Sequence, residues 1–80
     1  MSEIAIIIPC FNHAYVLRRT LEALKNQTLK PAEVVVVDDG STDAPSPIVA
    51  SCQTDLAIKF LRFETNRGAP AARNAGAAMT

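Results

Sequence analysis

The stretch Glu33-Val-Val-Val-Val-Asp-Asp-Gly-Ser-Thr-Asp43 decides how the rest of the chain folds. Its four consecutive valines predict a strand, and an unbroken apolar run is typical of a strand that is buried on both faces. The acidic, glycine-containing turn that follows ends this strand. Because successive side chains of a strand point to opposite faces, we expect Asp38 and Asp39 to diverge, so that only one of them faces a cleft.

The segments on either side of this stretch alternate between short apolar runs and longer amphipathic runs. Strands are expected over residues 4–8, 33–37 and 57–63, and helices over residues 14–26, 48–52 and 69–79. Because strands joined by helical crossovers must be parallel, this order predicts an α/β fold with a three-layer, Rossmann-like parallel sheet. The third strand alternates apolar and polar residues near its end, which favours a position at the edge of the sheet.

The starts of the helices are predicted from capping residues. Asn12 is expected to cap the first helix. Ser46 is expected to be the N-cap of the second helix, with Pro47 as its first helical residue. Residues 41–43 can also cap the helix that follows them.

The composition excludes several classes of protein. Apolar residues make up 49% and charged residues 20% of the 80, which is typical of a globular chain rather than a disordered one. Eight basic residues balance eight acidic ones, so neither a nucleic acid nor an anionic membrane is expected as the main partner. No apolar run approaches the roughly 20 residues of a membrane span, and the N-terminus lacks the basic residues of a signal peptide.

The two cysteines, Cys10 and Cys52, lie far apart without a CxxC motif or a paired histidine. This spacing argues against a structural zinc or iron–sulfur site. Two buried free thiols in a reducing compartment are favoured over one disulfide, and a cytoplasmic location is therefore expected.

Polar and irregular residues gather where the three expected strands end. In parallel sheets, ligands bind beyond the carboxyl ends of the strands. Those ends are residues 9–12, 38–41 and 64–68. Phe11 can stack on a planar ring, and the Asp38–Asp39 pair can accept hydrogen bonds from a base or sugar, or lie near a metal. Arg67 and Arg73 offer cations near a phosphate-binding rim.

Each of these residues also fits a purely structural role. The acidic stretch is equally compatible with a plain turn and helix cap, and the two arginines with solvated side chains. His13, the only histidine, fits a solvated residue of the first helical turn. Cys10 fits a packed thiol without a neighbouring base, and Gly76 fits close packing of the last helix on the sheet.

Four motifs in register resemble the N-terminal part of family 2 glycosyltransferases, which are inverting enzymes with the GT-A fold. They are Ile6-Ile-Ile-Pro9-Cys-Phe11-Asn12, Leu24-Lys-Asn-Gln27-Thr28, Val35-Val-Val-Asp38-Asp39-Gly40-Ser41-Thr42-Asp43, and Asn66-Arg67-Gly68 leading to Ala72-Arg73-Asn74-Ala75-Gly76. Each motif is weak alone, but their order and spacing extend the resemblance over essentially the whole chain. Residues 1–80 are therefore expected to be the first βαβαβα portion of a GT-A domain.

The resemblance implies a pocket for a nucleotide-diphosphate sugar, usually a UDP-sugar. Carried over, Asp39 would hold the base with Asp38 next to it. Phe11 and the backbone of Pro9 would flank the base, and Arg73 would lie near the nucleotide. The implied reaction is transfer of the sugar, with inversion, to an acceptor that the sequence does not identify.

The resemblance also implies parts of the enzyme that these residues do not supply. A DxD motif holding Mg²⁺ or Mn²⁺ is expected after the last helix, beyond Thr80, together with the acceptor site and the general base. Asp38 and Asp39 match a different motif, so neither a metal ligand nor a catalytic residue is expected within the 80 residues. Residues 44–47, Ala-Pro-Ser-Pro, depart from the family pattern and affect the length of the second helix.

A noncatalytic α/β module that self-associates or acts as a scaffold is the alternative to a nucleotide-binding portion. In folds of this kind the first three strands lie in the order 3-2-1, which leaves residues 4–8 at an edge. This strand is flat, β-branched and uncharged, and such an edge pairs readily with another chain. A homo-oligomer is therefore expected for the 80 residues alone.

Overall fold

The computed structural model describes residues 5–28, 31–43, 45–53 and 56–80. In chain order its elements are β1 (Ala5–Cys10), α1 (Ala14–Lys25), β2 (Glu33–Asp39), α2 (Ser46–Cys52), β3 (Ile58–Phe63) and α3 (Ala69–Ala78). The predicted alternation of strands and helices is confirmed. Among these residues no helix is long and apolar enough to cross a membrane.

The three strands form one parallel sheet in the order β1-β2-β3. β2 lies in the centre, where Cys10 of β1 is level with Asp38 and Phe63 of β3 is level with Asp39. All four valines of β2 are completely buried, as the unbroken apolar run predicts. The predicted strand order and the edge position of β3 are confirmed, and β1 forms the other edge.

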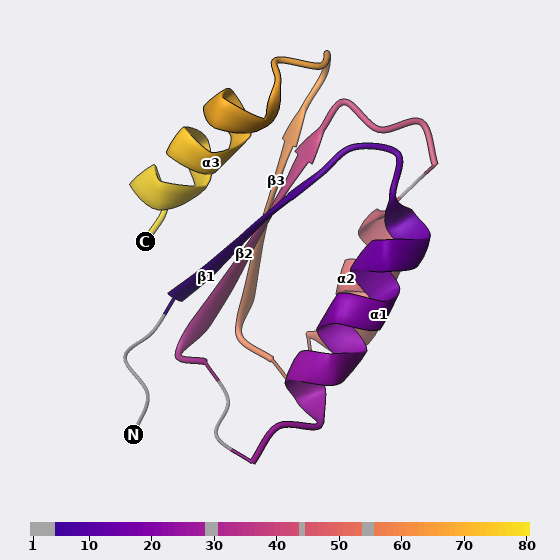
Figure 1. Cartoon of the computed structure of the whole chain (residues 1–80), viewed down its shortest axis with the longest axis vertical. Coiled ribbons are helices and arrows are strands. Elements are labelled where there is room, and N and C mark those ends of the chain that lie inside the picture. Colours follow the sequence, from indigo (N-terminus) through magenta and orange to yellow (C-terminus); the bar gives the residue numbers. More distant parts are fainter. Residues whose placement is uncertain (1–4, 29–30, 44, 54–55) are drawn as a thin grey trace.

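The helices cover both faces of the sheet, which gives the predicted three layers (Figure 1). On one face, Val34 and Val36 pack with Leu21 of α1 and its neighbours on α1 and α2. On the opposite face, Val35 and Val37 pack against α3. β2 therefore contributes alternate side chains to two separate apolar cores.

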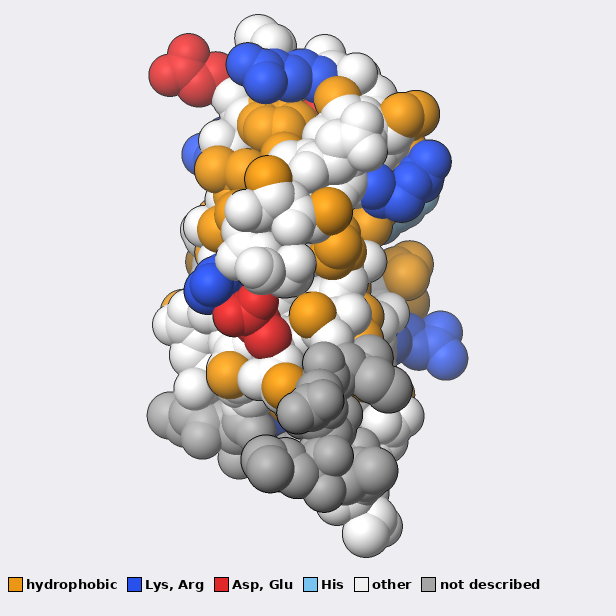
Figure 2. Space-filling view, turned by 90° about the vertical axis from the view of Figure 1, so that its left-hand side faces the viewer, with side chains coloured by type: hydrophobic (Ala, Val, Ile, Leu, Met, Phe, Trp, Pro, Cys, Tyr) orange, Lys and Arg blue, Asp and Glu red, His pale blue; other side chains and the backbone are white. Residues whose placement is uncertain are grey.

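α3 packs closely on the sheet because small residues face it. Ala72 and Gly76 are its buried residues. A β-carbon at Gly76 would lie 2.5 Å from Cγ2 of Ile7 and 3.2 Å from Cγ2 of Val37. This confirms the packing role expected for Gly76. Figure 2 shows the side of the molecule on which α3 lies, with apolar side chains dispersed among polar ones and basic side chains around its margin.

Two strand boundaries differ from the prediction. β2 continues for two residues beyond Val37 and includes both aspartates. β1 likewise continues through Pro9, which is level with Val37. A proline is tolerated there because β1 is an edge strand. Ile4, the first residue of the predicted strand, lies outside the described residues.

The predicted helix caps are wrong in detail. Asn12 does not cap α1; its side-chain oxygen instead accepts hydrogen bonds from the backbone N–H and the hydroxyl of Thr42. The first N–H of α1, that of Ala14, donates to Asp43 Oδ2 at 2.9 Å. Asp43 therefore caps the preceding helix in the chain rather than the following one. α2 begins at Ser46, one residue earlier than expected, and Pro45 is its N-cap.

We expect Gly76→Ala to lower the free energy of unfolding by about 2 kcal/mol, because overpacking at a contact of 2.5 Å costs about 3 kcal/mol and the gain in helix propensity offsets about 1 kcal/mol of it. Chemical denaturation followed by circular dichroism measures this change. In an Ile7→Ala background, which removes the Cγ2 atom at 2.5 Å, the same substitution is expected to cost less, because the contact of 3.2 Å with Val37 remains. Unchanged or higher stability of Gly76→Ala in the chain that retains Ile7 would contradict the packing argument.

Candidate functional site

The loops at the carboxyl ends of the strands surround a cavity of about 290 Å³. Its lining residues come from the end of β1 and the loop after it, from the end of β2, and from the loop that leads into α3. They are Pro9, Cys10, Phe11, His13, Asp39, Asn66, Gly68 and Ala69. The cavity therefore lies at the rim of the sheet where the sequence placed its polar and irregular residues.

Asp39 connects β2 to the loop before α3. Asp39 is 3% exposed, and its Oδ1 accepts a hydrogen bond from the backbone N–H of Arg67 at 2.7 Å. Oδ2 accepts one from the N–H of Gly68 at 2.9 Å and one from Asn66 Nδ2 at 3.0 Å. Because Gly68 is the N-cap of α3, Asp39 supplies the capping carboxylate that the helix itself lacks. A carboxylate has about four acceptor positions, so Oδ1 retains one for a ligand.

Gly40 allows the turn after β2 to approach this same loop. Its φ is +77°, a left-handed conformation that favours glycine. A β-carbon there would lie 2.7 Å from the backbone nitrogen of Asn66 and 2.8 Å from the carbonyl carbon of Thr65. Since both atoms belong to the backbone, no side-chain rotation relieves the contact. Glycine is therefore required for the two loops to pack together.

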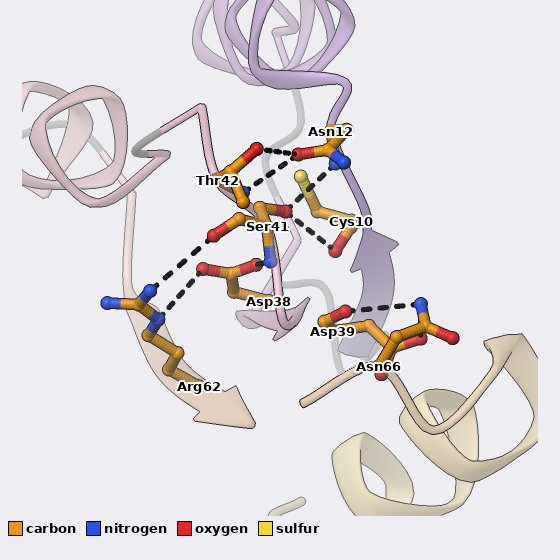
Figure 3. A network of polar contacts seen from close by, with 8 residues as sticks. All are labelled: Cys10, Asn12, Asp38, Asp39, Ser41, Thr42, Arg62 and Asn66. Atoms are coloured by element: carbon orange, nitrogen blue, oxygen red, sulfur yellow. Dashed lines mark hydrogen bonds and ion pairs between the residues drawn. The ribbon is translucent and has the colours of Figure 1, made fainter. Parts of the chain in front are cut away.

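Asp38 points away from the cavity, toward the other face of the sheet (Figure 3). It is 1% exposed, and Oδ1 accepts a hydrogen bond from the N–H of Ser41 at 2.8 Å. Arg62 Nε lies 3.5 Å from Oδ2, which has no hydrogen-bond partner among the described residues. We interpret this contact as an ion pair too long for a hydrogen bond. The expected divergence of the two aspartates is confirmed.

Phe11 stands at the mouth of the cavity on the loop between β1 and α1. Phe11 is 44% exposed, and Tyr15 and Val16 on α1 are exposed still more. The residues on both sides of it are held by the turn after β2, through Ser41 and Thr42 (Figure 3). Phe11 is therefore exposed to a ligand while its loop is anchored to the protein.

Cys10 lies at the inner wall of the cavity and is buried. Burial raises the pKa of its thiol above the ordinary value of 9.0, and the negative charges of Asp38 and Asp43 act in the same direction. The thiol is therefore protonated at neutral pH and is a poor nucleophile. This agrees with its interpretation as a packed thiol.

The sequence-predicted site residues are only partly brought together. Pro9, Phe11 and Asp39 line the cavity, whereas Asp38 does not. Arg73 is exposed on α3 and also lies outside the lining. Asp38 and Arg73 do not line the cavity, so their contact with a nucleotide stays a prediction.

The guanidinium of Arg67 stacks over the ring of Phe63, 4.6 Å from its centroid.

Sequence reasoning about individual side chains missed other lining residues. His13, assigned to solvent, is exposed but also borders the cavity. The sequence indicates a turn at Asn66 and Gly68, but it does not indicate their contact with Asp39. Their position in the sequence could have indicated this contact, because residues that follow neighbouring parallel strands meet at one edge of the sheet.

The described residues do not fit a metal site. They contain no group of three or more histidine, cysteine or acidic side chains placed to hold an ion. Asp38 and Asp39, the only adjacent acidic pair in the sequence, project to opposite faces.

A larger hollow, of about 440 Å³, lies on α1 and is lined by residues of that helix only. It is bordered by Val16, Arg19, Thr20, Ala23 and Leu24. It has neither a carboxylate nor an aromatic ring, and it lies away from the loops at the strand ends. We therefore take the cavity at the strand ends as the candidate site.

The chain is similar in sequence to known glycosyltransferases. Three relatives illustrate the similarity. An uncharacterized glycosyltransferase of Rickettsia conorii is 40% identical over 78 residues, which cover 94% of this chain and 12% of the relative. Validoxylamine A glucosyltransferase of Streptomyces hygroscopicus subsp. jinggangensis is 42% identical over 80 residues, 95% of this chain and 19% of the relative. Hyaluronan synthase of Pasteurella multocida is 43% identical over 75 residues, 91% of this chain and 8% of the relative.

The chain thus spans less than a fifth of the length of each of these relatives. The profile of the family described as Glycosyl transferase family 2 matches residues 5–80, which include every element of the structure. The match covers all four motifs and the whole candidate site. The chain therefore belongs to glycosyltransferase family 2.

Proposed function

We propose that these residues form the nucleotide-binding portion of an enzyme that transfers a sugar from a nucleotide-diphosphate sugar, with inversion, to an acceptor. UDP is the proposed nucleotide. The observation that carries the proposal is the cavity at the strand ends, which places an exposed aromatic ring, Phe11, beside a buried carboxylate, Asp39. Two of these relatives are named as a glycosyltransferase and a glucosyltransferase, which supports sugar transfer in general.

The chemistry of the cavity suits a nucleobase. The ring of Phe11 offers a face on which a planar base can stack. Asp39 Oδ1 retains an acceptor position for a ring N–H, such as the one that uracil carries between its two carbonyl groups. A volume of about 290 Å³ lies at the lower end of the range for ligand sites, so it holds a base rather than a whole sugar nucleotide. The diphosphate and sugar then lie outside it.

We expect Asp39→Asn to weaken UDP binding by roughly tenfold or more, because the amide replaces a charged acceptor by a donor on one side. Titration of the chain with UDP, followed by NMR, measures the dissociation constant. The control is Glu33→Gln, the same change from carboxylate to amide at the opposite end of β2, where Glu33 pairs with Lys59 at 3.0 Å. It is expected to leave UDP affinity within about twofold, since neither residue lines the cavity.

The UDP titration also tests the proposed function itself. Binding is expected to shift the signals of Phe11 and Asp39 first. No response of the wild-type chain up to millimolar UDP would contradict nucleotide binding. Equal effects of Asp39→Asn and Glu33→Gln on affinity would remove the cavity, though not the nucleotide, from the proposal. A shift at Arg73 would add that residue to the site.

The 80 residues alone are expected to bind the nucleotide without transferring sugar. The described residues provide no metal site, and we identify no candidate general base among them. Mg²⁺ or Mn²⁺, an acceptor site and a base are proposed to belong to other parts of the enzyme. Release of UDP from UDP-glucose in the presence of Mn²⁺, measured against a control without protein, is expected to stay at background. Protein-dependent release above that control would overturn this expectation.

We further propose that the protein works in a reducing compartment, the cytoplasm. Cys10 and Cys52 are both buried and both free. Free buried thiols are usual where glutathione and thioredoxin keep cysteines reduced.

Self-association as a scaffold is a second candidate function, favoured by the free edge of β1. Ile6, Ile7 and Ile8 are half-buried there, whereas the valines of β2 beside them are completely buried. In the sheet as described, β1 pairs with β2 alone, so its other side presents unpaired backbone groups. We propose that two copies of the 80 residues pair along this edge.

Ile6→Lys is expected to convert the oligomer to monomer, because a charge on an edge strand opposes pairing. Light scattering at micromolar concentration measures the mass. The matched control is Ile58→Lys, since Ile58 is also half-buried, packs against the same core and lies on the opposite edge. The control is expected to lower stability but leave the mass unchanged. A wild-type monomer of 8.6 kDa would refute self-association.

A further inference from the structure

One buried hydroxyl, that of Ser41, bridges the two residues that flank Phe11. Ser41 Oγ accepts a hydrogen bond from the backbone N–H of Asn12 at 2.9 Å. The same hydroxyl donates to the carbonyl oxygen of Cys10 at 3.4 Å. Ser41 is 2% exposed and does not line the cavity. It therefore contacts the loop from behind, while Phe11 projects between the two bonded residues.

The loop that carries Phe11 needs such a support. β1 ends at Cys10 and α1 begins at Ala14, so the residues between them belong to neither element. Asn12 has a φ of +52°, a left-handed conformation that is uncommon for residues other than glycine. Backbone in this region persists when surrounding contacts hold it. Without them, the direction of Phe11 is not fixed by its own chain.

The other hydrogen bonds that join this loop to the turn after β2 act only on its second half, while the Cys10 thiol contacts the backbone of His13 within the loop itself. Thr42 donates two hydrogen bonds to the side chain of Asn12, and both are exposed to solvent. Asp43 accepts from the N–H of Ala14. Within the described part of the chain, Ser41 is the residue whose side chain holds the backbone on both sides of Phe11. It is also buried, so water does not compete with its bonds.

Ser41 is itself held in place by Asp38. The N–H of Ser41 donates to Asp38 Oδ1, and Arg62 Nη2 approaches the carbonyl oxygen of Ser41 at 3.5 Å. Figure 3 shows these contacts on the side of β2 opposite to Asp39. The aspartate that faces away from the cavity is thus connected to the cavity through Ser41.

We propose that Ser41 is a positioning residue for the nucleotide pocket: its hydroxyl fixes the direction in which Phe11 meets the base. This inference rests on the proposed function, since it requires that Phe11 stacks on the base of a bound nucleotide. Ser41 touches neither the cavity nor a ligand within it. It acts through the backbone of Cys10 and Asn12.

The direct test uses a fluorescent reporter in place of Phe11. The chain contains no tryptophan, so Phe11→Trp introduces a single indole fluorophore at the site. In this background, Ser41→Ala is compared with Ser51→Ala, a matched control. Ser51 is exposed, and its hydroxyl donates to the carbonyl oxygen of Ile48 at 2.8 Å within α2. Acrylamide quenching and anisotropy of the introduced indole report how firmly the loop is held, independently of any ligand.

Ser41→Ala is expected to increase the quenching of the introduced indole and lower its anisotropy, while Ser51→Ala changes neither. In the chain with Phe11, Ser41→Ala is expected to raise the dissociation constant for UDP about tenfold, which corresponds to ~1.4 kcal/mol. Unchanged quenching would overturn the proposal. Increased quenching with unchanged UDP affinity would also overturn it, because the support would then have no bearing on binding.

Failure of the proposed function gives a different result. If the wild-type chain does not bind UDP, the quenching experiment still decides whether Ser41 holds the loop, but its role toward a nucleotide falls. If Ser41→Ala does not fold, amide exchange of the wild-type protein replaces it. The N–H of Asn12 is expected to exchange at least about tenfold more slowly than in an unstructured chain. Exchange at the unstructured rate would overturn the proposal.

Discussion

β2 has neighbours on every side: β1 and β3 flank it, α1 and α2 cover one face, and α3 covers the other. Its side chains alternate between these faces, and this alternation continues into the two aspartates at its end. Asp39 follows Val35 and Val37 and meets the loop before α3. Asp38 follows Val34 and Val36 and meets Ser41. The contacts at the rim of the sheet are thus set by the same geometry that builds the two cores.

The rim is held together by charged and polar groups of one turn. Residues 38–43 provide three carboxylates, and each accepts a backbone N–H from a loop or from the start of a helix. Buried carboxylates are tolerated when their oxygens accept such bonds. The cavity is consequently a product of cross-loop contacts. Its walls come from segments distant in sequence that this single turn brings together.

The fold could be predicted from the sequence because its signals are local. The four valines and the leucines of α1 carry strand and helix periodicity in their own neighbourhood, and parallel pairing follows from the helical connections. The sequence did not predict where β2 ends. Asp38 and Asp39 are typical turn residues, and only their pairing with β1 and β3 shows that they belong to the strand. Tertiary contacts also overrode the local preference of Asn12 for capping.

The site could be predicted only to the level of which loops form it. The position of Phe11 and Asp39 at the strand ends was sufficient to place them together. The separation of Asp38 from the cavity followed from strand alternation, although the resemblance had put both aspartates in the pocket. The partners of Asp39, by contrast, depend on the close approach that Gly40 permits. No pattern within one segment contains that information, because it arises from the packing of two backbones.

The parallel sheet also has a consequence for how the chain reaches its native state. Each residue of β2 pairs with residues that lie a whole helix away along the chain, on both sides. No strand pair can form through a short hairpin. The chain therefore loses conformational entropy in closing a long loop before strand pairing contributes favourable free energy. Folding is therefore slower than for a helical bundle of this size. During that delay the four valines, which are completely buried in the folded chain, are exposed to other chains, which makes a newly synthesised copy vulnerable to aggregation.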